Sequence, residues 1–270
     1  MSTGPPTVAS VTEADLAVIG GTGFYAFLDD PVEHPVDTPY GAPSAPVAVG
    51  TVSGRRVAFL PRHGKHHDFP PHAINYRANA WALRSLGVRQ VLAPCAVGGL
   101  RDTVAPGDLV VPDQLVDRTH RRVGSFVERG AVHLPFADPY CPGVRHALAS
   151  AGVKAGGTMV VVEGPRFSTR AESAHYAAQG WDLINMTGAP EAALARELGQ
   201  CYAALALVTD MDAGADSGGG VGQAEVFALF RANLERLTGL LGEAIKALPD
   251  PAGCSCATWA DGIELTYDVP

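Results

Sequence analysis

Two aspartates separated by one residue follow an apolar run in the C-terminal half of the chain. Asp210 and Asp212 come directly after residues 202–209, and the glycine-rich stretch 214–220 follows them. Open α/β sheets bind ligands beyond the carboxyl ends of their strands, so two such acids can face one bound molecule. A carboxylate that accepts a hydrogen bond, beside a protonated one that donates, would recognise the edge of an aminopurine. Taken alone, the spacing is more typical of a solvated acidic turn.

A glycine-rich turn follows the first predicted strand, 16–19. Gly20-Gly21-Thr22-Gly23 would expose backbone N–H groups that can bind an anion. The motif also resembles the dinucleotide-binding turn of extended short-chain dehydrogenases. Those enzymes need a Tyr four positions before a catalytic Lys, and Lys65, Lys154 and Lys246 all lack one. A dehydrogenase-like protein that binds NAD(P) is therefore only a remote alternative.

A cationic loop follows the strand predicted at 56–60. Arg62 offers a bidentate fork for phosphate, and His63 offers a further donor. A metal site is the competing interpretation, but adjacent His66 and His67 cannot easily converge with His63 on one ion, and no acid has a suitable spacing. We expect no metal ligands here. The remaining alternative to an anion site is a solvated basic turn.

A third turn, made of the small residues 96–100, follows the strand predicted at 91–93. Its backbone could reach the same anion as the two loops before it. Three predicted strand ends are thus suited to binding a phosphate-like group.

Composition limits the classes of function. The chain has 270 residues, of which 47% are hydrophobic and 18% charged, so one large domain is expected. The net charge of -8 argues against nucleic acid or an anionic membrane as a partner. No run approaches the roughly 20 apolar residues of a membrane span, and the N-terminus lacks the pattern of a secretion signal. We expect a cytoplasmic protein.

Cysteine usage fits a reducing compartment. The chain has five cysteines, and Cys95, Cys141 and Cys201 lie in or beside apolar segments, where reduced buried thiols are usual. Cys254 and Cys256 could form a strained redox pair or half of a metal site. No second cysteine pair lies near them in the sequence, so a flexible tail is the favoured interpretation.

Strands alternate with helices along most of the chain, a pattern typical of a mainly parallel sheet between two layers of helices. Strands are predicted at 16–19, 47–52, 56–60, 91–93, 108–112, 157–162, 182–186 and 202–209, and helices at 75–86, 168–179, 191–198 and 223–248. Ser53-Gly54 joins two strands as an antiparallel hairpin. We expect one three-layer α/β/α domain with a mixed sheet over residues 15–249, a flexible lead-in at 1–14 and a C-terminal tail at 250–270.

Longer motifs lie at the predicted strand ends and helix starts. They are Asn75-Tyr76-Arg77-Ala78-Asn79, Glu163-Gly164-Pro165-Arg166-Phe167-Ser168-Thr169-Arg170-Ala171-Glu172-Ser173, Asn185-Met186-Thr187 and Thr209-Asp210-Met211-Asp212. Together with the turns at 20–23 and 61–64, they closely resemble the trimeric purine nucleoside phosphorylase family, in the family's order over residues 16–248. Within it the chain looks most like the S-methyl-5'-thioadenosine phosphorylases. The block at 163–173 is too long for a chance match.

The resemblance implies phosphorolysis, in which inorganic phosphate, as co-substrate, attacks C1' of a nucleoside while the purine departs. It implies no cofactor. By analogy, the phosphate is held by Thr22, Arg62, His63, the backbone of Ala96, Thr187 and the position of Cys95. The ribose and base are bound by His67, Phe167, Ser168, Asn185 and Met186, and the catalytic pair is Asp210 and Asp212. A protonated Asp210 would donate to N7 of the leaving purine, and its apolar strand-end setting predicts a raised pKa.

The resemblance also implies a homotrimer. His133 matches a residue that, in the family, reaches into the 5' pocket of the neighbouring subunit. A methylthio group needs an apolar pocket, and Leu237, Leu240 and Leu241 of the predicted terminal helix could contribute to it from a neighbour.

Two aspartates favour a 6-aminopurine. Family members that act on 6-oxopurines generally carry Asn at the position of Asp210, because a carboxylate would face the lone pairs of the oxo group. The expected reaction is therefore cleavage of S-methyl-5'-thioadenosine, in purine and methionine salvage. Gly188 and Ala189 resemble members that prefer 6-oxopurines, so a phosphorylase of those nucleosides, or of another 5'-substituted adenosine, stays an alternative. A hydrolytic nucleosidase would not require phosphate, and a binding protein would not turn over.

Cys95 departs from the family pattern, because many methylthioadenosine phosphorylases have a Thr near phosphate at this position. We predict that Cys95→Thr leaves activity unchanged or lowers the KM for phosphate, since a hydroxyl is a stronger hydrogen-bond donor than a thiol. Steady-state kinetics at varied phosphate concentration would measure this. Complete loss of activity would show instead that the thiol has a role of its own.

Overall fold

The computed structural model describes residues 14–21, 27–149, 153–213 and 220–270. Its strands form one eleven-stranded sheet. They are β1 (Leu16–Gly20), β2 (Asp29–His34), β3 (Val47–Val52), β4 (Arg55–Pro61), β5 (Gln90–Gly99), β6 (Leu109–Val111), β7 (Gln114–Asp117), β8 (Lys154–Ala155), β9 (Thr158–Val161), β10 (Leu183–Asn185) and β11 (Cys201–Met211). Most of the predicted lead-in, and Thr22 and Gly23 of the glycine-rich turn, lie outside the described residues.

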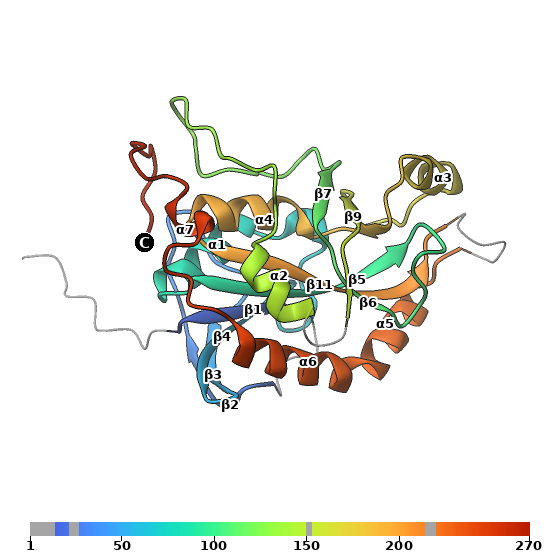
Figure 1. Ribbon diagram of the computed structural model, residues 1–270, viewed down its shortest axis with the longest axis horizontal. Helices are drawn as coiled ribbons and strands as arrows, with labels where there is room; N and C mark the ends of the chain where they lie inside the picture. The colour runs from blue at the N-terminus through green and yellow to red at the C-terminus, as the bar shows by residue number, and fades with distance from the viewer. Residues whose placement is uncertain (1–13, 22–26, 150–152, 214–219) are drawn as a thin grey trace, which may run out of the picture.

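Helices cover the sheet on both sides. They are the short 3-10 helix η2 (Pro71–Ala73) and α1 (Tyr76–Ser85), α2 (Pro142–Ala149), α3 (Arg170–Ala178), α4 (Gly188–Glu197), α5 (Gln223–Ala232), α6 (Leu234–Ala247) and α7 (Ser255–Thr258). α1 and α4 lie above the central strands in Figure 1, and α5 and α6 lie below them. The predicted α/β fold with a mixed sheet is confirmed. Within the described residues, no helix is long and apolar enough to cross a membrane.

Local sequence signals explain several element boundaries. Ser53 and Gly54 join β3 to β4 with φ angles of 50° and 78°, as a two-residue hairpin turn requires. The Asn75 side chain accepts a hydrogen bond from the Ala78 N–H at the start of α1. Thr169 and Glu172 form a capping box that starts α3. The predicted hairpin and helix starts are therefore confirmed.

β5 is the central strand and is longer than its sequence suggests. It pairs in parallel with β1 and β11 and antiparallel with β10. The turn predicted at 96–100 is wrong, because β5 continues through Gly99. Its small residues serve close packing: a Cβ on Gly98 would lie 2.9 Å from Ile184, and one on Gly99 would lie 2.7 Å from the sulfur of Met211.

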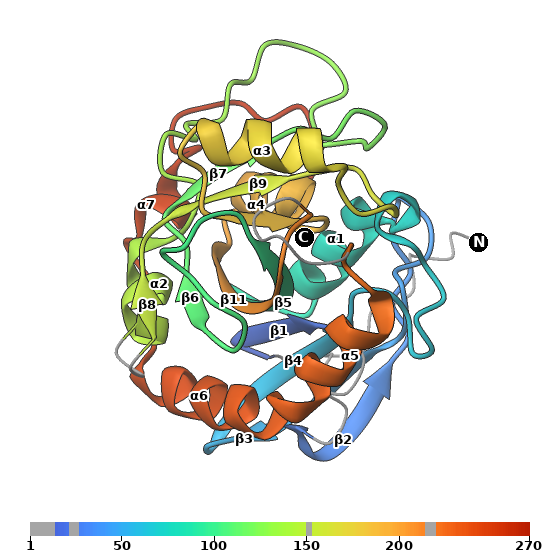
Figure 2. The ribbon, with the colours of Figure 1, turned by 90° about the vertical axis from the view of Figure 1, so that its right-hand side faces the viewer.

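One edge of β5 is open over part of its length. β1 pairs with it only as far as Leu92, and β10 pairs with it only from Gly98. Over the same stretch the opposite edge pairs continuously with β11. A gap therefore opens in the sheet between β1 and β10, beside residues 93–97. Figure 2 shows these strands between α5 and α6 below and α3 and α4 above.

β11 carries Asp210, and Asp212 directly follows its last residue. The strand continues to Met211, with a register shift against β5 between Val208 and Asp210. Asp210 is thus a strand residue, and the solvated acidic turn considered from the sequence is excluded. Because side chains alternate along a strand, Asp210 and Asp212 point to the same side.

The terminal helix predicted at 223–248 is two helices. α5 ends before Asn233, whose side chain donates a hydrogen bond to the Leu229 carbonyl at 3.0 Å. Such a side-chain bond competes with the helical ladder, so an Asn favours a helix end. The break leaves α5 free to run in a different direction from α6 (Figure 2).

The C-terminal segment packs against the domain, in contrast to the flexible tail favoured from its sequence. Cys256 is fully buried in the main hydrophobic core. The Tyr267 hydroxyl donates to the Glu197 carbonyl at 2.7 Å, and its ring packs against Phe126 at 5.8 Å. Both ends of this segment are therefore tied to the body of the protein.

Candidate active site

A pocket of about 510 Å³ lies at the gap beside β5. This volume is in the range of small-molecule sites and suits a nucleoside with an anion. Most of the residues predicted for the site line it, namely Arg62, His63, His67, Cys95, Ala96, Phe167, Ser168, Asn185, Met186, Thr187, Asp210 and Asp212. His133 is exposed and is not part of this lining. Thr22 lies outside the described residues.

Arg62 is held by a buried ion pair that the sequence analysis missed. Its Nε and Nη2 donate to the two carboxylate oxygens of Glu191 at 2.7 and 2.9 Å. Arg62 is 2% exposed and Glu191 4% exposed. The Tyr202 hydroxyl donates to the same carboxylate at 2.8 Å. A charged residue in the otherwise apolar, Ala-rich stretch 188–195 is the sequence signal that could have revealed Glu191.

The remaining donors of Arg62 reach the backbone of the sheet. Nη2 donates to the Ile19 carbonyl at 2.9 Å, and Nη1 donates to the Pro94 carbonyl at 3.3 Å. A guanidinium has five N–H groups, so these four bonds leave one N–H on Nη1 for a ligand. Burial alone would lower the pKa of Arg62, but Glu191 outweighs it and holds that pKa above its ordinary value. Arg62 therefore stays charged and rigid.

The open edge of β5 offers backbone groups to the pocket. The carbonyls of Pro94 and Ala96 point into the gap, where Arg62 and Asn185 donate to them. The N–H of a strand residue points to the same side as its carbonyl, so the Ala96 N–H faces the gap as well. A proline is tolerated at position 94 because no neighbouring strand needs its missing N–H.

Asn185 organises the loop between β10 and α4. Its Oδ1 accepts hydrogen bonds from the backbone N–H groups of Thr187 and Gly188, both at 2.7 Å, and its Nδ2 donates to Ala96 at 3.1 Å. Thr187 is thereby fixed in the pocket lining just before α4, whose backbone is kinked and non-helical at Ala189. Asn185 acts here mainly as a positioning residue.

His63 enters the pocket as a neutral ring. Burial lowers its pKa to about 4. The ring nitrogen Nδ1 lies 2.9 Å from the Phe69 carbonyl, which can only accept, so Nδ1 carries the proton. Nε2 then presents a lone pair, and not the donor expected from the sequence. The ring stacks on His67 at 4.4 Å, and His67 in turn contacts Phe227 edge-on.

Asp210 and Asp212 differ in their hydrogen-bond partners. Burial raises the pKa of Asp210 to about 6, and among the described residues the Thr209 hydroxyl donates to its carboxylate at 2.7 Å. Burial also raises the pKa of Asp212, but the hydroxyls of Ser173 and Ser168 donate to that carboxylate. Because hydroxyl donors stabilise an ionised carboxylate, Asp210 is the member of the pair that holds a proton more readily. The raised pKa expected for Asp210 is confirmed.

Ser173 is the second contact that sequence reasoning missed. It is buried on α3 and donates to Asp212. The same helix follows Phe167 and Ser168, which line the pocket. The capping box at Thr169 fixes where the helix starts, and so fixes the direction in which these side chains point.

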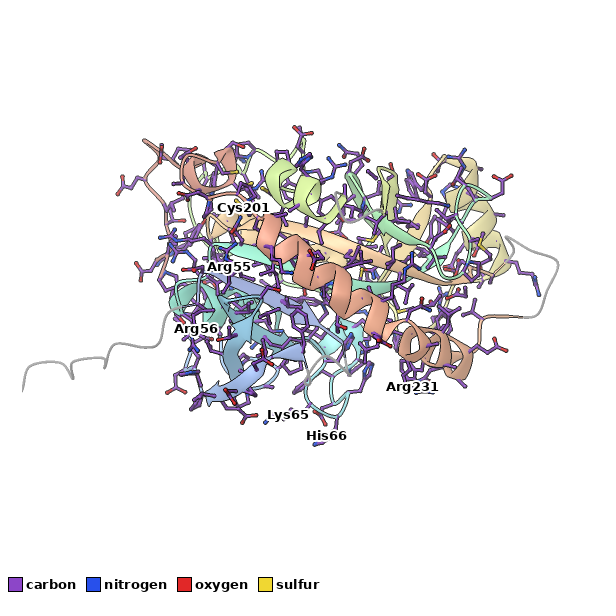
Figure 3. The ribbon with its side chains drawn as sticks, turned by 60° about the horizontal axis from the view of Figure 1, so that its bottom comes forward. Arg55, Arg56, Lys65, His66, Cys201 and Arg231 are labelled. Carbon is purple, nitrogen blue, oxygen red and sulfur yellow. The ribbon has the colours of Figure 1, made fainter. Side chains whose placement is uncertain are left out.

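The apolar wall of the pocket comes from α5 and the start of α6. Its members are Val226, Phe227, Phe230 and Leu234, with Arg231 beside them (Figure 3). The suggestion that Leu237, Leu240 and Leu241 form such a wall from a neighbour is wrong. Leu237 and Leu241 are fully buried in the core of their own chain, and Leu240 packs against that core. The helix break at Asn233 explains why the prediction failed, because it lets α5 face the pocket while α6 packs against the core.

Comparison with known proteins agrees with this geometry. Residues 15–246 match the family model described as the phosphorylase superfamily. The chain belongs to the phosphorylase superfamily. A purine nucleoside phosphorylase of Streptomyces coelicolor is 54% identical over 97% of this phosphorylase and 100% of its own length. An S-methyl-5'-thioadenosine phosphorylase of Mycolicibacterium smegmatis is 55% identical over 94% of this chain and 99% of its own.

Solved structures give the same result for the fold. A crystal structure of a methylthioadenosine phosphorylase from an antarctic soil metagenomic library matches this phosphorylase with a TM-score of 0.84 at 39% identity. The match covers 92% of this chain and 91% of the other. The family resemblance seen in the sequence motifs is therefore confirmed.

Replacing Glu191 with Gln should destabilise this phosphorylase. The change leaves Arg62 buried without its counter-charge, and breaking a buried ion pair costs about 3–5 kcal/mol. Urea unfolding measures this cost. Added phosphate should restore part of it, because a bound anion would face the same guanidinium. Tyr202→Phe is the matched control, since it removes one hydrogen bond of about 1 kcal/mol. A loss for Glu191→Gln no larger than that of the control would contradict the assignment.

Replacing Asp210 with Asn should stabilise the unliganded protein at neutral and alkaline pH. Asp210 loses its proton near pH 4 when unfolded and at about 6 when folded, so stability falls as pH rises through this window. Asn removes this penalty, about 1–3 kcal/mol at pH 8 and none at pH 4. Urea unfolding at both pH values measures the gain. The exposed Asp261→Asn variant should show no gain, and an equal gain for Asp210→Asn at both pH values would refute a titration effect.

Proposed function

We propose that the protein cleaves S-methyl-5'-thioadenosine with inorganic phosphate, giving adenine and 5-methylthioribose 1-phosphate. The observation that carries this proposal is the Asp210 carboxyl group, half-buried near Asp212 in the same pocket as Arg62. A proton donor for the base and an anchored cation for phosphate are the two groups that the reaction needs. Phosphate serves as co-substrate, and the proposed reaction uses no cofactor.

The phosphate end of the site supplies donors that replace the hydration of the anion. Arg62 offers its remaining N–H, the Ala96 N–H faces the same space, and Thr187 lines the same pocket. The neutral His63 can accept the hydrogen of monohydrogen phosphate through Nε2. This arrangement presents a phosphate oxygen to C1' of the nucleoside and stabilises the positive charge that develops on the ribose.

The base end stabilises the departing purine. As the glycosidic bond breaks, negative charge accumulates on the purine, and a protonated Asp210 donates to N7. With a pKa of about 6, roughly one molecule in ten carries this proton at pH 7 before substrate binds. Asp212, whose carboxylate accepts from Ser168 and Ser173, accepts from the exocyclic amino group of adenine.

The apolar wall supports a 5' substituent without charge. Val226, Phe227 and Phe230 are arranged to contact an alkylthio group but could not solvate a phosphate. Relatives with the name S-methyl-5'-thioadenosine phosphorylase, such as that of Mycolicibacterium smegmatis, cover nearly the whole chain. The wall and these names support methylthioadenosine over an unsubstituted nucleoside.

A 6-oxopurine nucleoside is the second candidate substrate. It is favoured by the relative from Streptomyces coelicolor, whose name is purine nucleoside phosphorylase. The sequence argument for a 6-oxopurine rests on Gly188 and Ala189. The structure weakens it, because both residues are buried and neither lines the pocket. The pair of aspartates supports adenine more directly.

The homotrimer, the role of His133 toward a neighbouring subunit and the cytoplasmic location are also part of the proposal. The exposed position of His133 outside the pocket is compatible with a contact to a second chain. Sedimentation of the purified protein would measure the assembly.

Phosphorolysis of methylthioadenosine and of methylthioinosine, each with and without phosphate, tests the proposed reaction. The wild type should require phosphate and prefer methylthioadenosine. Asp210→Asn should shift the ratio of the two kcat/KM values toward methylthioinosine by roughly 10²-fold or more, because the amide can donate to the 6-oxo group. Asp261→Asn should leave the ratio unchanged. A wild type that prefers methylthioinosine would sink the adenine assignment, and turnover without phosphate would indicate a hydrolase.

A further inference from the structure

Four of the five cysteines meet at one place, far from the pocket along β11. The sulfur atoms of Cys141, Cys201, Cys254 and Cys256 all lie within 4.8 Å of one another. Cys254 is partly buried and the other three are buried. Cys201 starts β11, and Arg231 of the pocket wall lies toward the other end of the molecule (Figure 3). Cys141 and Cys201 are distant from Cys254 in the sequence, but the fold brings them beside Cys254 and Cys256.

We propose that these four cysteines bind a structural zinc ion. Zinc prefers four tetrahedral thiolate ligands at about 2.3 Å, which places neighbouring sulfur atoms about 3.8 Å apart. The Sγ atoms of Cys141 and Cys254 are separated by 3.8 Å. The cluster has the ligand number and the spacing for one ion, and it leaves no open coordination position for a substrate.

The backbone holds the ligands from three separate segments. The Cys141 N–H donates to the Tyr202 carbonyl and the Cys201 N–H donates to the Arg89 carbonyl, both at 2.8 Å. Cys254 and Cys256 lie on either side of the start of α7, and the Cys254 N–H closes a turn onto the Pro251 carbonyl at 3.1 Å. Two ligands are thus fixed by the body of the domain and two by the C-terminal segment.

Charge and packing around the cluster suit a bound cation. Four thiols that bind Zn²⁺ release four protons and leave a complex with a net charge of about -2. Arg196 is buried close enough to act electrostatically on Cys256, and so offsets part of that charge. A Cβ on Gly199 would touch the backbone of Cys256 and Ala257, so α7 lies directly on the end of α4.

The ion would fasten the C-terminal segment to the domain. Tyr267 also anchors this segment, because its hydroxyl donates to the Glu197 carbonyl. The Glu197 carboxylate in turn accepts from Ser125 and from the Phe126 N–H. A zinc site would therefore stabilise the loop around Phe126 as well as the tail. This role is independent of the substrate and of the proposed reaction.

Metal analysis of the purified full chain tests the proposal. We expect about one zinc per chain after reconstitution with Zn²⁺ under reducing conditions and removal of the excess. Cobalt in place of zinc should give the strong visible absorption of a tetrahedral thiolate site. Cys254→Ser should lose most of the bound metal and lower the melting temperature by about 5–10 °C. Cys95→Ser is the matched control for metal content, because Cys95 is buried outside the cluster.

Thiol counting on the wild type keeps the test decisive if a variant does not fold. The folded, zinc-loaded chain should release zinc in step with the modification of four thiols, and after denaturation with a chelator it should show five reactive thiols. Five reactive thiols with no zinc bound would overturn the proposal. One or three thiols before reduction would show disulfides in its place, and iron with inorganic sulfide would show a different cluster.

Discussion

The open edge of β5 is the constraint on which the site depends. Where β1 and β10 diverge from this strand, backbone groups that a complete sheet would pair are left to other partners. Arg62 and Asn185 fill that need by donating to Pro94 and Ala96. The same side chains also shape the pocket. The same two side chains therefore pair the free backbone carbonyls of β5 and form part of the pocket.

Burial of charge is the second property that the site requires. Glu191 lies against Arg62 and offsets the lost hydration of its charge, and burial raises the pKa of Asp210. Both arrangements oppose folding stability locally, since buried charges lose hydration. Hydrophobic strands on either side, with β5 and β11 almost wholly buried, supply the compensating free energy.

Local signals predicted the fold well, and tertiary contacts account for the differences. The starts of α1 and α3 follow from Asn75 and Thr169, because caps act within one turn. The continuation of β5 through Gly98 could not be predicted, since its glycines serve packing against distant residues. Most of the pocket residues were found through motif resemblance. Glu191 was missed because its partner lies far away in sequence, and the same holds for the cysteine cluster.

The proposed phosphate-binding and base-binding residues lie on different strands, and this separation affects how substrate preference can evolve. In the proposed reaction, phosphate is bound by residues that follow β4, lie in β5 and precede α4, whereas the base is faced by two aspartates at the end of β11. A single substitution in β11 can therefore alter which purine is accepted while the anion-binding framework stays intact. Descendants of one ancestor could diverge in base preference without passing through an inactive form. Such divergence would explain why two relatives of similar identity to this chain are named for different substrates.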